Sequence, residues 1–101
     1  MFPPKIKDLL TELRQQTEDE NLDWVYDDDL AMVATRYKSN AIQVKYTFNE
    51  NKEIGEFLVK VINKAGKEYF FAADQESPND YTLARKLYDL AQSSDLDIDL
   101  G

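Results

Sequence analysis

Residues 41–74 contain three short runs rich in valine, isoleucine, tyrosine and phenylalanine, separated by two turn signals. In each run apolar side chains recur at every second position, which is the period of a β-strand. The first turn, at residues 49–52, carries two asparagines, and the second, at residues 63–67, contains a glycine. Short turns of this composition join antiparallel neighbours. The stretch therefore predicts an antiparallel meander, and we expect the rest of the chain to cover it.

Two further segments extend the predicted sheet toward the N-terminus. Residues 30–37, LAMVATRY, fit the spacing of either a helix or a strand. The short polar link at residues 38–40 is typical of the connection between hairpin strands, so we interpret 30–37 as a strand. Residues 22–26 also alternate, which allows a short strand or an extended entry. The sheet is thus expected to have four or five strands.

Amphipathic helices are predicted on both sides of the sheet. Pro3 and Pro4 can begin a helix over about residues 4–18, since the first helical turn needs no backbone donor. Ser77 and Pro78 can begin a second helix over about residues 78–92 in the same way. The buried stripe of the first would comprise Ile6, Leu9, Leu10, Leu13 and Thr17, and that of the second Leu83, Ala84, Leu87, Leu90 and Ala91.

The order of elements is helix, four or five antiparallel strands, helix (α-β-β-β-β-α). Two helices that flank a meander can lie side by side on one of its faces, which gives a two-layer α+β sandwich. No linker or internal repeat divides the 101 residues, so we expect a single domain over 1–101 with an acidic, alternating tail from about 94 to 101.

The composition excludes much catalytic chemistry. Cysteine and histidine are absent, which removes thiolate nucleophiles, imidazole bases and the usual zinc ligands. The sequence has no GxGxxG, P-loop or GxSxG motif. We expect no cofactor, no catalytic residues and no bound metal, although a small enzyme remains an alternative. No run approaches the roughly 20 apolar residues of a membrane span, and the first residues lack a secretory h-region. We therefore expect a cytoplasmic protein that does not bind membranes.

The net charge of −8 is unevenly distributed along the chain. Residues 1–29 hold nine acidic against three basic residues, and residues 68–101 hold eight against two. Residues 30–67 hold seven basic against three acidic residues. The acidic flanks can neutralise the basic middle when they fold over it. The overall charge opposes direct binding to phosphate, so no nucleic-acid partner is expected. An acidic protein that mimics DNA is an alternative consistent with this charge.

Residues 18–29, EDENLDWVYDDD, contain seven acids and no base. They form a solvated turn, a docking segment for a basic partner, or a divalent-metal site; the register of a calcium-binding EF-hand loop is not met, because no glycine follows the aspartates. The candidate acidic docking residues are Asp23, Trp24, Asp27, Asp28 and Asp29.

The second face of the predicted sheet is unusually apolar. The side chains expected to point at the helices are Val44, Tyr46, Phe48, Phe57, Val59, Tyr69 and Phe71. The opposite parity then places Leu58, Ile62, Phe70 and Ala72 outward, interleaved with Lys45 and Lys60. A solvated face of an antiparallel sheet should alternate cleanly between apolar and polar, and this one does not. An apolar patch rimmed by lysines is typical of a protein-binding or dimer surface. Alternatively, the N-terminal strand, the acidic tail or one helix covers it.

These observations favour a non-catalytic protein-interaction module, of the inhibitor, immunity, adaptor or small-chaperone type. It would bind a protein partner or a second copy through the outer sheet face or through its acidic ends. The candidate partner-binding residues are Lys45, Leu58, Lys60, Ile62 and Phe70. The alternatives are a small enzyme or divalent-metal-binding protein that uses residues 18–29, and an acidic DNA mimic.

Overall fold

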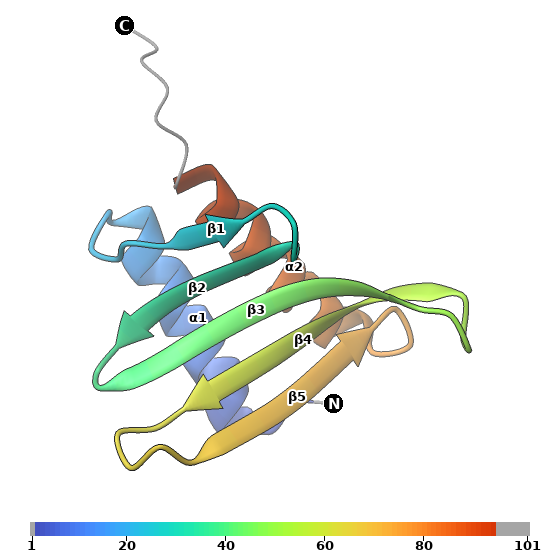
Figure 1. Ribbon diagram of the computed structural model, residues 1–101, viewed down its shortest axis with the longest axis horizontal. Helices are drawn as coiled ribbons and strands as arrows, with labels where there is room; N and C mark the ends of the chain where they lie inside the picture. Colours follow the sequence, from blue (N-terminus) through green and yellow to red (C-terminus); the bar gives the residue numbers. More distant parts are fainter. Residues whose placement is uncertain (1, 95–101) are drawn as a thin grey trace, which may run out of the picture.

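The computed structural model describes residues 2–94, which form two helices and one sheet (Figure 1). The elements are α1 (Pro4–Glu18), β1 (Val25–Asp27), β2 (Met32–Tyr37), β3 (Asn40–Asn49), β4 (Ile54–Ile62), β5 (Glu68–Asp74) and α2 (Pro78–Ser94). The predicted α+β class and order of elements are confirmed, with five strands in the sheet. The acidic tail predicted from about residue 94 lies, beyond Ser94, outside the described residues.

The sheet is an antiparallel meander with the strand order β1-β2-β3-β4-β5. The segment that fitted either a helix or a strand is the strand β2, which pairs with β3 from Met32 opposite Lys45 to Tyr37 opposite Asn40. Only two residues join these strands, and both have positive φ angles, 49° at Lys38 and 68° at Ser39. A two-residue hairpin with that backbone matches the twist of the strands that it connects, so it fixes their register.

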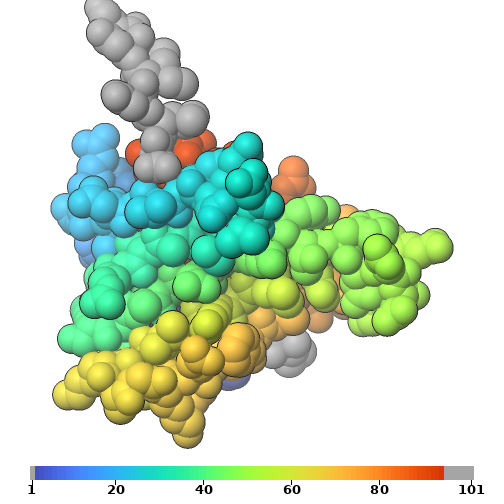
Figure 2. Space-filling model, viewed as in Figure 1, coloured from blue at the N-terminus to red at the C-terminus, as the bar shows by residue number. Residues whose placement is uncertain are grey.

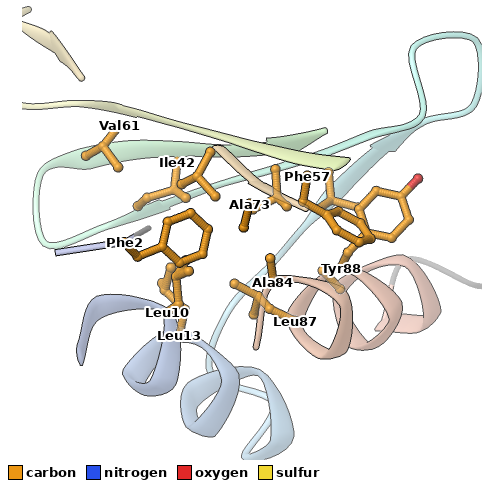
Figure 3. Close-up of a cluster of buried hydrophobic side chains, with 14 of the residues drawn as sticks. Phe2, Leu10, Leu13, Ile42, Phe57, Val61, Ala73, Ala84, Leu87 and Tyr88 are labelled. Atoms are coloured by element: carbon orange, nitrogen blue, oxygen red, sulfur yellow. The ribbon is translucent and has the colours of Figure 1, made fainter. Parts of the chain in front are cut away.

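Both helices pack on one face of the sheet, and the core lies between the two layers (Figure 3). Leu10 and Leu13 of α1 and Leu87 of α2 are fully buried there, as their helical spacing predicted. The sheet contributes the side chains of matching parity, namely Val33, Ile42, Val44, Phe57, Val59, Val61 and Ala73. The aromatic ring of Tyr88 lies edge-on to that of Tyr26, which joins α2 to β1.

Phe2 is a core residue that the sequence did not reveal. Its side chain is only 1% exposed, and its backbone N–H donates a 2.7 Å hydrogen bond to Oδ2 of Asp80. Asp80 is itself buried in the first turn of α2, and the Lys7 ammonium lies 3.5 Å from its other oxygen, Oδ1. A buried carboxylate needs such partners. This contact fastens the start of the chain to α2, more than seventy residues away.

The β3–β4 hairpin extends beyond the helices (Figure 1). Tyr46 and Phe48 have the parity of the core side, yet they are 39% and 56% exposed. Both side chains point to the helical side as expected, but the helices do not cover them, because the hairpin is longer than the layer beneath it. Tyr69 of β5 is similarly exposed. The ring of Tyr46 lies instead over Gly55, where an added Cβ would collide with the tyrosine hydroxyl.

Candidate interaction surface on the outer sheet face

The strand register brings the predicted outward residues together on the face opposite the helices. Leu58 lies between Lys45 of β3 and Ala72 of β5, and the adjacent row places Lys60 opposite Phe70. Ile62 is the next residue of β4 with the same parity. All five candidate partner-binding residues thus share one surface, which we call the outer face.

A shallow apolar hollow of about 270 Å³ lies at the centre of the outer face. We call it the outer-face groove; its outward-facing lining residues are Met32, Gln43, Lys45, Leu58, Lys60, Phe70 and Ala72. The groove crosses β2 to β5 and is built entirely from strands. Figure 2 shows this side of the molecule, where the surface is formed by the strands rather than by the helices.

The apolar side chains of the outer face are exposed to different degrees. Phe70 is 68% exposed and Leu58 36% exposed, whereas Ile62 is half-buried. The Lys60 ammonium lies 5.6 Å from the centroid of the Phe70 ring and 3.2 Å from a carboxylate oxygen of Glu68. Lys60 is therefore held above the aromatic ring by an acidic neighbour. A large exposed aromatic ring beside a positioned cation resembles the anchor residues of protein interfaces.

Lys45 lacks such a neighbour. Among residues 2–94, no acidic side chain lies within ion-pair distance of its ammonium group. Arg36, which shares the outward parity of Met32 on β2, is exposed and has no ion-pair partner in the part of the chain that the structure describes. The outer face therefore carries two cations whose charge is not neutralised by the described fold.

Two of the three covers considered for the outer face are ruled out by the arrangement of the elements. Both helices lie against the opposite face (Figures 1 and 2). The N-terminal strand β1 pairs edge to edge with β2 and continues the sheet instead of crossing it. Within residues 2–94 nothing lies over the groove. The third cover, the acidic tail, lies outside the described residues.

The apolar surface continues toward β1 through a second hollow. This hollow is lined by Asp23, Val25, Ala34, Arg36 and Gln43 among others, so it is partly polar, and Gln43 borders both hollows. Val25 is 68% exposed. Sequence reasoning did not assign these residues to the surface, because the pairing of β1 with β2 was not predicted. The alternation of Met32 and Ala34 with the buried Val33 was the available signal.

The acidic segment at residues 18–29 is built differently from the docking site proposed for it. Trp24 is 3% exposed and its Nε1 donates a 2.8 Å hydrogen bond to Oγ1 of Thr17, so Trp24 belongs to the core. Asp27 accepts a 3.2 Å hydrogen bond from the backbone N–H of Leu30, and Asp28 accepts one from the Tyr26 hydroxyl. These two aspartates stabilise the turn into β2, as short acidic side chains commonly do.

The remaining acids of the segment point into solvent. Asp23 and Asp29 are both exposed. Between residues 2 and 94, no group of three or more acidic side chains is close enough to hold a metal ion.

Two charged clusters elsewhere shift the pKa values of their members. The hydroxyl of Tyr37 donates a 2.5 Å hydrogen bond to Glu12, and the Lys38 ammonium lies 3.1 Å from the same oxygen. These contacts hold the pKa of Glu12 below its ordinary value, chiefly through the tyrosine hydroxyl. The pKa of Asp74 is lowered as well, mainly by the backbone N–H of Glu76 and further by the nearby Lys52.

Residues 2–94 form a two-layer α+β fold and leave the apolar outer face of the sheet uncovered. No protein-family model matches the chain, and comparisons with curated proteins and with solved structures find no significant match. Neither helix in the described part of the chain combines the length and apolar character needed to cross a lipid bilayer.

Proposed function

We propose that this chain is a non-catalytic protein-interaction module of the cytoplasm that binds a protein partner through its outer face. Leu58, Ile62 and Phe70 form the apolar centre of the contact, and Lys45 and Lys60 form its charged rim. The observation that carries the proposal is that this apolar surface is left uncovered by every element between residues 2 and 94.

Physical considerations support a binding role. The solvent-facing side of an antiparallel sheet normally carries polar side chains, because exposing apolar side chains to water is unfavourable. Contiguous exposed apolar patches with a polar rim are instead a property of interaction sites. The groove is open and shallow, which suits a protein surface better than an enclosed small-molecule pocket.

Replacement of Phe70 by Ser tests the proposal. Because Phe70 is 68% exposed, we expect the melting midpoint of Phe70→Ser to change little. Binding through the outer face should weaken sharply, since a central aromatic anchor is commonly worth about 2 kcal/mol or more. Melting is followed by circular dichroism, and association by sedimentation velocity over a concentration series.

Phe48→Ser is a matched control. Phe48 is 56% exposed but lies on the hairpin with the opposite parity, so its replacement should leave association unchanged. A severe loss of stability in Phe70→Ser without any change in association would contradict a binding role for the outer face.

A further inference from the structure

We propose that the outer-face groove binds residues 95–101 of a second copy of this chain, so that two copies exchange these segments. The inference rests on the proposed function, because it names the partner of the same surface. It follows from three observations: the chemistry of the groove, the sequence of residues 95–101, and the place where α2 ends.

The segment has the sequence DLDIDLG, in which Asp95, Asp97 and Asp99 alternate with three aliphatic residues. When such a sequence is extended, successive side chains point to opposite sides. One side would present Leu96, Ile98 and Leu100, and the other would present the three carboxylates. The described part of the chain has no other segment in which acids and aliphatic residues alternate so regularly.

The groove is complementary to both the aliphatic side and the carboxylate side of this segment. Its floor is apolar, with Leu58, Phe70 and Ala72 available to the aliphatic side. The ammonium groups of Lys45 and Lys60 stand on the same face; Lys60 is paired with Glu68, whereas Lys45 has no acidic partner within residues 2–94. A chain with a net charge of −8 thus presents, on an apolar surface that residues 2–94 leave uncovered, cations that match an acidic segment.

The segment of the same chain is too short to fill the groove. α2 ends at the β1 edge of the sheet, in the helical layer (Figure 1), and the contact between Tyr88 and Tyr26 joins this helix to β1. Leu58 and Phe70 lie on the third and fourth strands beyond β1. With a strand spacing of about 4.8 Å, these positions are about 14 and 19 Å away across the sheet.

Residue 98 is four residues beyond Ser94 and can extend at most about 14 Å from it, and residue 100 about 22 Å. The segment would first have to pass around the edge of β1 from the helical layer, which uses much of that length. Two of its three aliphatic residues, Leu96 and Ile98, therefore cannot reach Phe70 in the same chain. A second copy has no such restriction, and reciprocal exchange closes the assembly as a dimer with two-fold symmetry.

Truncation after Ser94 is the first test. We expect the full chain to be dimeric in a sedimentation-velocity concentration series and the chain of residues 1–94 to be monomeric. Far-UV circular dichroism should show that the truncated chain keeps its helices and sheet, because residues 2–94 contain the whole described core. A monomeric full chain would overturn the proposal.

A peptide-binding experiment then places the segment on the groove. A fluorescently labelled peptide of residues 95–101 should bind the truncated chain, and a peptide of the same composition with its three aspartates grouped together should bind at least tenfold more weakly. Combined replacement of Lys45 and Lys60 by Glu should abolish binding. Lys86→Glu, on the exposed side of α2, is the matched charge-reversal control and should leave binding unchanged.

The remaining outcomes separate this proposal from the proposed function. The truncated chain could bind the peptide while the full chain stays monomeric. This result would mean that the segment binds the groove of its own chain, and it would overturn the exchange. A truncated chain that remains dimeric, and loses the dimer in Phe70→Ser, would mean that two outer faces pack together; the exchange then fails while the binding role of the face survives. If Phe70→Ser alters no association at all, both proposals fail.

Discussion

At the scale of single residues, the contact between Trp24 and Thr17 links the start of the sheet to α1. The Thr17 hydroxyl accepts a hydrogen bond from the indole Nε1 and donates a 2.7 Å hydrogen bond to the carbonyl of Leu13. Both side chains are buried. The indole N–H is the only polar group of the Trp24 side chain, and the Thr17 hydroxyl is its acceptor. Because both side chains are buried, water could not take the place of this acceptor unless the core rearranged.

Thr17→Val should therefore destabilise the fold by about 1–3 kcal/mol, since it leaves the buried indole N–H without an acceptor at nearly constant side-chain volume. Thr17→Ser keeps the hydroxyl and is the control; it should cost less. Urea unfolding followed by circular dichroism measures both. Equal stabilities of Thr17→Val and the unchanged chain would show that the indole finds another acceptor.

The sequence predicted one member of this pair correctly and assigned the other to the wrong environment. The helical spacing placed Thr17 on the buried stripe of α1. Trp24 was assigned to a docking surface because seven acids surround it in the sequence. Acidic neighbours indicate that a segment is near solvent, but alternate residues of an extended segment point in opposite directions, so one aromatic side chain can still enter the core.

At the scale of elements, the two helices supply the most buried leucines of the structure. Leu10 and Leu87 are each fully inaccessible to solvent, on stripes that face the sheet and each other. Replacing either with Ala should cost about 2–5 kcal/mol, the usual range for a buried leucine that leaves a cavity. Melting curves measure this loss, and Leu30→Ala, at a side chain that is 47% exposed, should lie close to the unchanged chain.

A melting midpoint unaffected by both core substitutions would contradict the assignment of the core to these helix faces. A loss in one helix only would show that the other contributes little to the cooperative unit. The two losses should also be less than additive if the leucines share one cavity, which the double variant tests.

The strand periodicity predicted which side each side chain takes, and the register confirms that Leu58 and Phe70 share one face with Lys45 and Lys60. It could not predict how far the helical layer extends beneath each strand. Phe48 is exposed for that reason. The part of the outer face near β1 was also missed, because a strand of three residues gives too short a pattern to place Val25.

At the scale of the whole molecule, charge governs the response to pH. The sequence contains 20 acidic residues and no histidine, so few groups titrate between about pH 6 and 8. Glu12 and Asp74 have pKa values below their ordinary values of 4.5 and 3.8 in the folded state. Each of these carboxylates stabilises the folded state at pH values above its ordinary pKa, where it is ionised in both the folded and the unfolded chain.

We therefore expect stability to be constant near neutrality and to fall below about pH 4.5, as these two carboxylates take up protons more readily in the unfolded chain. The loss continues until the pH passes their lowered folded-state values. Urea midpoints measured between pH 2.5 and 8 check this, and Glu12→Gln should show a smaller acid loss. A transition centred near pH 6.5 would indicate instead a buried carboxylate with a strongly raised pKa.

The packing of α1 on α2 has a consequence for how the chain is made. The strands between the helices pair with their neighbours in sequence, so hairpin after hairpin can form as the polypeptide leaves the ribosome. The leucines of α1, by contrast, wait for a helix that begins sixty residues after α1 ends, which at about 5–20 residues per second is a delay of several seconds. During that interval the nascent chain exposes the leucine stripe of α1 and the face of the sheet that later packs against the helices. Both apolar surfaces, the leucine stripe of α1 and the helix-facing side of the sheet, are buried only after α2 has been synthesised. The complete core therefore forms late in translation.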